Sequence, residues 1–144
     1  MRLYNTLTRQ VEPFVPLRDN TVRMYTCGLT VYARGHIGNF RTFTFYDLLR
    51  RVLKRRGFIL DHVMNITDVE DKIIMRAQYE EVEASVVAER YIAEYEGHLR
   101  ELNIIPAIAY PRVTTEMDNI ISMVKGLIDK NAAYPADGDV YFRV

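Results

Sequence analysis

The sequence predicts an α/β fold centred on a parallel sheet. Three features carry this prediction: an extended run at residues 21–26 leading into a glycine-containing loop, an amphipathic run at helical spacing over 40–56, and a second extended run at 58–64. This order forms a βαβ unit, whose strands are parallel and whose crossover is right-handed in nearly all proteins. Both strands therefore end at one sheet edge, where ligands of such sheets bind.

Composition fits one domain with a buried core. The chain has 144 residues, of which 49% are hydrophobic and 11% aromatic. No apolar run approaches the roughly 20 residues of a membrane span, and the N-terminus lacks the apolar stretch of a secretory signal. The single cysteine excludes an internal disulfide and suits a reducing compartment. We therefore expect a cytoplasmic protein without membrane contact.

The net charge is zero, but charge is distributed unevenly. Residues 1–72 carry 12 Lys and Arg against 7 Asp and Glu, whereas residues 73–144 carry 7 against 12. The first half is thus the better candidate for phosphate contacts. A basic run at residues 50–56 is typical either of a solvated helix end that complements the helix dipole or of nucleic-acid contact.

The elements follow in order. Residues 1–20 form a short leading segment that ends in a turn at Asp19-Asn20, and Gly57 caps the first helix. The strand at 58–64 places Leu60, His62 and Met64 on one face, so His62 is expected in the core or at the sheet edge. Thr67 or Asp68 is then expected to cap a helix that continues to residue 80.

Two further helices and a hairpin complete the chain. A helix over residues 83–102 has an apolar stripe that predicts core, and His98 is expected to face solvent. Prolines break residues 103–112, and a helix opening at 114–117 has a second apolar face. Residues 133–144 predict a short strand, an Asp137-Gly138 turn and a longer strand with an exposed edge. The two stripes are Val86, Val87, Tyr91, Tyr95, Leu99 and Leu102, and Met117, Ile120, Ile121, Val124, Leu127 and Ile128.

The loop after the first strand has the features of a nucleotide site. Glycines let the backbone approach a ligand, and free N–H groups at a helix start face phosphate. If the helix begins at His36, then His36 and Asn39 lie on one face of its first turn, and Gly38 leaves room for a base or ribose.

The tetrapeptide at residues 36–39, His-Ile-Gly-Asn, resembles the His-Ile-Gly-His signature of class I aminoacyl-tRNA synthetases. Its context resembles the cysteinyl-tRNA synthetases over nearly the whole chain. Three positions depart from that family: Ala33 replaces an acidic residue, Asn39 a second histidine, and Glu70 an aspartate. Asparagine can donate and accept hydrogen bonds but cannot carry the charge of an imidazolium. The matching segments are residues 3–9, 27–32, 41–43, 64–73 and Pro111-Arg112.

The resemblance implies a Rossmann-like domain of the class I synthetase (HUP) type, with helices on the faces of its sheet. Residues 1–132 would be the N-terminal half of the catalytic domain, and residues 133–144 the start of an inserted connective-peptide hairpin. The implied catalytic residues are His36 and Asn39. ATP would be bound by His36, Gly38 and Asn39, and cysteine by Cys27, Gly28, Thr30 and Thr67, with Cys27 also a zinc ligand.

Alternatives remain for single residues. A lone cysteine at a strand end is by default a small buried hydrophobe. Thr67 can act as a helix cap as well as a wall of the site, and Arg112 can lie beside the active site or be a surface arginine after a proline.

The implied activity joins cysteine to tRNA(Cys) through cysteinyl-AMP, using Mg²⁺-ATP and zinc. Zinc selects the substrate thiol because soft sulfur binds it far better than a hydroxyl does. The sequence has no match to the Lys-Met-Ser-Lys-Ser loop, the later zinc ligands or the anticodon-binding bundle of the family. We therefore expect the N-terminal part of a larger enzyme, inactive alone, with remaining zinc ligands outside this chain, weak tRNA binding and possible self-association.

Two other functions stay open. One is the related ligase that activates cysteine for mycothiol synthesis. The other is a non-catalytic paralogue that acts as a binding module.

Overall fold

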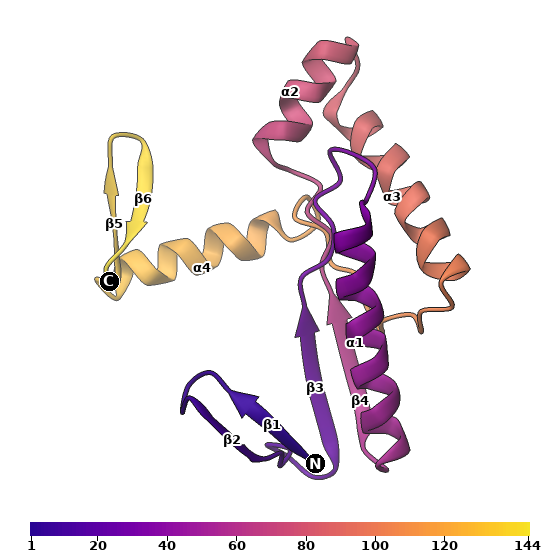
Figure 1. Cartoon of the computed structure of the whole chain (residues 1–144). Coiled ribbons are helices and arrows are strands. Elements are labelled where there is room, and N and C mark those ends of the chain that lie inside the picture. Colours follow the sequence, from indigo (N-terminus) through magenta and orange to yellow (C-terminus); the bar gives the residue numbers. More distant parts are fainter.

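The computed structural model describes residues 1–144. In Figure 1, α1 and α3 lie on one side of the strands β3 and β4, while α4 and the C-terminal hairpin stand away from them. The elements are β1 (Arg2–Asn5), β2 (Gln10–Pro13), β3 (Thr21–Thr26), α1 (Ile37–Arg55), β4 (Ile59–Met64), α2 (Asp71–Glu80), α3 (Ala84–Glu101), α4 (Met117–Asp129), β5 (Ala133–Ala136) and β6 (Asp139–Phe142).

The predicted parallel pair is confirmed. β3 and β4 pair in parallel from Thr21 opposite Ile59 to Thr26 opposite Met64. A third extended segment lies beside β4: the N–H of Ile108 donates to the carbonyl of His62 at 2.8 Å, and that of Ile66 donates to Pro111 at 2.9 Å. From the sequence, we expected only a break at Pro106 and Pro111 here. α3 in fact ends at Glu101, before either proline, and the chain at residues 109–112 lies parallel to β4 through bridges from Ala109 to Val63 and from Arg112 to Ile66.

The sheet buries one of its two faces. Val22, Thr26 and Met64 are buried, whereas Arg23 and Tyr25, which alternate with the first two, are exposed. The core beside the buried face combines strand-end residues with side chains from α1, α2 and α3. Its members are Leu29, Val31, Phe43, Met64, Ile66, Ile73, Ala77, Val87, Ala88, Tyr91, Ile92, Tyr95, Leu99 and Ile104.

The stripe predicted on α3 is confirmed in its centre and wrong at its ends. Val86 is 47% and Leu102 is 48% exposed, because Val86 turns about 100° away from buried Val87 and Leu102 lies where the helix ends. The expectation that His98 faces solvent is also wrong. Its ring packs edge-on against Phe40 of α1, with 5.2 Å between ring centroids, and its Nδ1 is buried without a partner.

The cap of α2 differs from the predicted one. Glu70 is the N-cap, and its carboxylate accepts a hydrogen bond from the N–H of Lys72 at 2.8 Å. Asp68 is buried instead and accepts a hydrogen bond from the N–H of Thr114 at 3.1 Å. The backbone of Thr67 bonds to the loop after β3. Tertiary contacts thus occupy both residues that local sequence favoured as caps.

Arg50 and Arg51, which open the basic run, form neither a freely solvated helix end nor a surface for nucleic acid, because both bind backbone carbonyls of this chain. Arg50 is 3% exposed, and its guanidinium donates to the carbonyls of Ile105 and Pro106. Arg51 donates to Asn103, and the carboxylate of Asp47 accepts from the N–H of Ile105 at 2.9 Å. Arg50 and Arg51 therefore fasten α1 to the loop after α3, whereas residues 54–56 form an exposed basic helix end.

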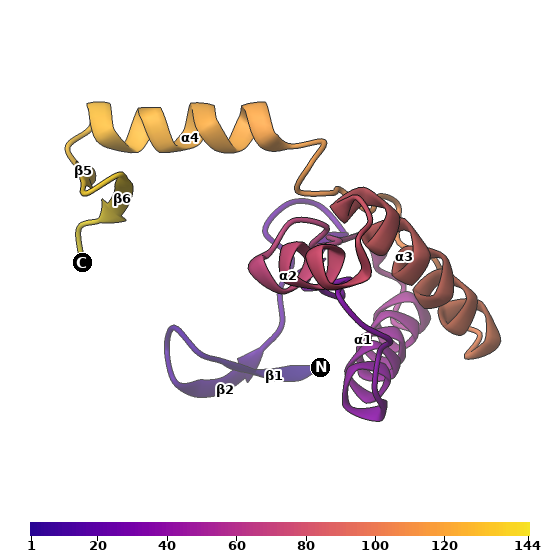
Figure 2. The same ribbon diagram turned by 90° about the horizontal axis from the view of Figure 1, so that it is seen from above.

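The apolar face of α4 does not join the core, contrary to expectation. No residue of this helix is buried, and Ile120 and Ile121 of the predicted face are 39% and 44% exposed. Viewed from above in Figure 2, α4 runs away from the other helices and carries β5 and β6 at its far end. The Asp137-Gly138 turn is confirmed, with φ of 51° and 89°, but its two strands are equally long, at four residues each.

The leading segment contains structure that the sequence analysis did not anticipate. Strands β1 and β2 pair antiparallel, with Arg2 opposite Pro13 and Asn5 opposite Gln10. The intervening turn places Arg9 at a positive φ of 55°. None of the helices in the molecule is both long and apolar enough to cross a membrane.

Candidate active site

The candidate site lies where β3 and β4 end side by side. The N–H of Val31 donates to the carbonyl of Thr67, and the N–H of Thr67 donates to Leu29, both at 3.1 Å. These bonds and an isolated parallel bridge between Thr30 and Thr67 join the two loops. The structure therefore brings together Gly28, Thr30 and Thr67, which the sequence assigned to one site.

Gly28 is required by this close approach of the loops. Its N–H donates to the side-chain Oδ1 of Asn65 at 3.1 Å. A Cβ at position 28 would lie 1.8 Å from the carbonyl oxygen of Asn65, well inside the contact distance of two atoms. Only a residue without a side chain fits here. Asn65 is a site residue that the sequence analysis did not single out.

The start of α1 fixes the two polar side chains of the signature. His36 is the N-cap, and its Nδ1 accepts a hydrogen bond from the N–H of Gly38 at 3.1 Å. In return, the Oδ1 of Asn39 accepts from the N–H of His36 at 2.9 Å. The prediction that both lie in the first turn is confirmed. A Cβ on Gly38 would meet the His36 ring at 2.9 Å, so glycine allows the ring to fold back.

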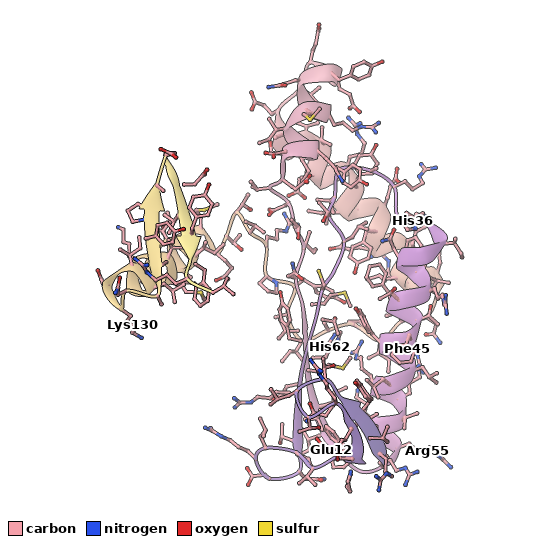
Figure 3. The ribbon with its side chains drawn as sticks, turned by 60° about the vertical axis from the view of Figure 1, so that its left-hand side comes forward. Glu12, His36, Phe45, Arg55, His62 and Lys130 are labelled. Carbon is pink, nitrogen blue, oxygen red and sulfur yellow. The ribbon has the colours of Figure 1, made fainter.

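This capping arrangement decides which hydrogen-bonding groups face outward. Because Nδ1 of His36 accepts a bond, the neutral ring carries its proton on Nε2. The amide of Asn39 accepts through oxygen, so its nitrogen keeps its hydrogens for other partners. His36 is exposed and lies at the first turn of α1, well separated from His62 in the middle of the sheet (Figure 3). The mouth of the site, which we define as the loop after β3 together with the first turn of α1, thus offers hydrogen-bond donors, and donors suit anionic oxygens.

A cavity of about 170 Å³ opens at this mouth. It is smaller than the roughly 300–1,000 Å³ of a typical ligand pocket, so it can take one part of a nucleotide, such as a phosphate or ribose. Cys27, Gly38 and Thr67 do not line it. A larger cavity of about 610 Å³ lies at the opposite end of β3 and contains none of the predicted site residues. The smaller cavity is lined by Gly28, Leu29, Thr30, Tyr32, Ala33, Arg34, His36 and Asn39.

Two charged residues at the mouth escaped the sequence analysis. Arg34 pairs with Glu94 of α3 through two contacts, Nε to Oε2 at 2.9 Å and Nη2 to Oε1 at 3.1 Å. This pairing raises the pKa of Arg34 and lowers that of Glu94. Lys72 places its ammonium 5.1 Å from the centre of the Tyr32 ring. The available signal for Arg34 was a cation in the loop immediately before the signature.

Cys27 directly follows β3, and its thiol is free and exposed. The default interpretation, a small buried hydrophobe, is therefore wrong. Nowhere in the chain do three or more His, Cys, Asp or Glu side chains gather so that they could hold a metal ion. One accessible thiol is a suitable zinc donor, but a closed site needs about four ligands. This chain can supply only part of such a set.

His62 and Arg112 have structural partners. His62 is 1% exposed, as expected for a core residue, with its Nε2 2.8 Å from the hydroxyl of Thr26, and burial lowers its pKa from 6.5 to about 4. Its Nδ1 has no partner. Arg112 forms an ion pair with Glu89 of α3, and its backbone bridges to Ile66. It is half-buried rather than a free surface arginine.

The fold is shared with a solved aminoacyl-tRNA synthetase. A structure from Campylobacter jejuni described as an arginyl-tRNA synthetase superposes with a TM-score of 0.67 over 87% of this chain and 38% of its own. At 12% identity, this likeness supports the fold alone. It confirms the predicted α/β class with its parallel sheet.

The sequence identifies the particular family. Residues 13–144 match the family described as tRNA synthetases class I (C) catalytic domain, and the chain belongs to that family. Cysteine-tRNA ligases of Gloeobacter violaceus and Bacillus licheniformis are each 48% identical over 144 and 143 residues, and that of Thermosynechococcus vestitus is 45% identical over 144. These matches cover 99–100% of this chain and 30–31% of the relatives. The chain thus spans about 30% of their length.

Proposed function

We propose that this chain is the N-terminal part of the catalytic domain of a cysteine-tRNA ligase, which forms cysteinyl-AMP from cysteine and Mg²⁺-ATP and transfers cysteine to tRNA(Cys). The observation that carries the proposal is the capped start of α1, where His36 and Asn39 line a cavity at the sheet edge while their capping bonds use Nδ1 and Oδ1 and leave Nε2–H and the amide N–H groups free to donate. The similarity to cysteine-tRNA ligases along the whole chain supports it.

The donors suit the first reaction step. The cysteine carboxylate attacks the α-phosphate of ATP, and pyrophosphate leaves, so negative charge shifts over the phosphate oxygens. Hydrogen-bond donors that are already fixed in position stabilise the transition state, where this charge develops, more than they stabilise the bound substrates. They therefore lower the activation barrier. The ring of His36 is held by the hydrogen bond that its Nδ1 accepts from the N–H of Gly38, and the amide of Asn39 by the bond that its Oδ1 accepts from the N–H of His36. Asn39 contributes a donor without a full positive charge.

Zinc fits this proposal only as a group shared with residues outside this chain. Cys27 would be one ligand, since its thiol is exposed beside Gly28 and thiolate is a strong zinc donor. When bound, zinc supplies a soft acceptor for the substrate thiol and so favours cysteine over serine. Gly28, Thr30 and Thr67 would form the neighbouring wall of the cysteine site. Residues 133–144 would begin the connective-peptide insertion.

In the full-length protein, we expect substitution of Cys27 with serine to lower zinc content and to reduce discrimination of cysteine from serine. The alcohol oxygen is a poor replacement for a thiolate ligand. Elemental analysis of the purified variant and exchange assays with each amino acid measure both effects. Full zinc occupancy in the variant would contradict the assigned role of Cys27.

Exchange of labelled pyrophosphate into ATP tests the function itself. The full-length protein should catalyse exchange that depends on cysteine and should charge tRNA(Cys). The 144-residue chain should catalyse neither, because it brings one candidate zinc ligand and only part of the cavity that ATP requires. Transfer to an amino sugar instead of tRNA would favour the mycothiol-type ligase. Absence of exchange in the full-length protein would favour a binding module.

A further inference from the structure

Arg34 is the one lysine or arginine among the residues that line the cavity at the mouth. It shares this lining with His36 and Asn39, whose outward groups are donors. A triphosphate carries several negative charges, and neutral donors alone leave that charge largely uncompensated. Lys72 lies nearby but is held over the ring of Tyr32. Arg34 is thus the cation best placed to meet an anion in the cavity.

The present partner of Arg34 is exchangeable. Glu94 engages the guanidinium through two parallel contacts of 2.9 and 3.1 Å, the fork geometry that phosphate oxygens also satisfy. The side chain of Arg34 is 72% exposed and that of Glu94 is 30% exposed. Exposed ion pairs contribute little to stability, so a phosphate can replace the carboxylate at small cost. The two contacts meanwhile hold Arg34 at the rim of the cavity.

We propose that Arg34 binds a phosphate group of ATP at this mouth and that Glu94 competes with the nucleotide for the guanidinium. This inference rests on the proposed function, because it takes ATP to be the ligand of the cavity. It assigns Arg34 and Glu94 opposite effects on nucleotide affinity. A purely structural ion pair, which shapes the loop before His36, would make loss of either partner harmful.

Calorimetric titration of the 144-residue chain with Mg²⁺-ATP and with adenosine separates these roles. Arg34→Gln should weaken ATP binding roughly tenfold, as expected for loss of a charge-assisted hydrogen bond, and leave adenosine binding unchanged. Glu94→Gln should strengthen ATP binding several-fold. Arg76→Gln is a matched control, because Arg76 pairs with Glu80 at 2.7 Å in α2 and does not line the cavity.

The exchanged pair, Arg34→Glu with Glu94→Arg, provides a second test that keeps the ion pair. It should abolish measurable ATP binding, because a carboxylate replaces the cation at the rim, while circular dichroism should remain unchanged. If Glu94→Gln weakens ATP binding, or if the exchanged pair binds ATP normally, the inference is wrong. Binding of adenosine without a gain from the triphosphate would also overturn it and leave the proposed function standing. Failure of the 144-residue chain to bind either ligand would overturn this inference, whereas the proposed function is judged separately by pyrophosphate exchange in the full-length protein.

Discussion

Substituting His36 with alanine in the full-length protein should lower kcat for pyrophosphate exchange by about 100- to 1,000-fold and leave the KM for cysteine nearly unchanged. This is the loss measured when one fixed donor to a developing negative charge is removed. The donor is Nε2–H, which points outward because Nδ1 is bonded to Gly38. An interaction made mainly in the transition state changes kcat more than KM.

A second substitution separates catalysis from helix capping. His36→Ala also removes the N-cap of α1, a loss worth about 1 kcal/mol of stability. His36→Asn should keep that stability, since asparagine caps well, but should lose the rate because its short amide does not reach the position of Nε2. Thermal melts and exchange kinetics of both variants give the comparison. Normal activity of His36→Asn would assign His36 a capping role only.

Gly28→Ala should be the most destabilising single-methyl substitution in this chain, by about 3 kcal/mol or more. The added Cβ would sit 1.8 Å from the carbonyl oxygen of Asn65, so backbone must move. That movement breaks the bond from Gly28 to Asn65 and strains the bridge between Thr30 and Thr67. Urea unfolding of the 144-residue chain measures the loss.

Gly126→Ala is the matched control for that substitution. Gly126 lies within α4, and a Cβ there meets nothing within 4 Å. Alanine is the better helix former, so this change should stabilise α4 by up to about 1 kcal/mol. If Gly28→Ala unfolds at the same urea concentration as the wild type, the close approach of the loops at the sheet edge does not contribute to stability.

Local patterns were sufficient to predict the order of strands and helices between residues 21 and 142. Alternation identified β3 and β4, the 3.6-residue period identified α1 and α3, and the Asp137-Gly138 turn identified the hairpin. The resemblance added the residues of the mouth. His36 and Asn39 were correctly expected in one helical turn, because helical spacing alone brings residues three apart onto one face.

The errors arose where distant segments decide the structure. Asp68 looked like a helix cap, but Thr114 occupies its carboxylate. Arg50 looked solvated, but carbonyls more than fifty residues away bury it. The apolar face of α4 was predicted from its helical spacing, yet the helix packs mainly against β5 and none of its residues is buried. The pairing of Arg34 with Glu94 spans sixty residues and has no local signature. Amino-acid composition and hydrophobic periodicity reflect residues that are close in sequence, so they contain no information on contacts between distant segments.

α4 holds the C-terminal hairpin at a fixed distance from the sheet. Its 13 residues extend roughly 20 Å at 1.5 Å per residue, and Asp68 anchors the segment just before it through Thr114. Adding or removing a helical turn would shift the hairpin by about 5.4 Å while Gly28, Asn65 and His36 kept their places. The length of α4 therefore sets the distance between the mouth and the hairpin, and a change in that length leaves the residues at the sheet edge in place.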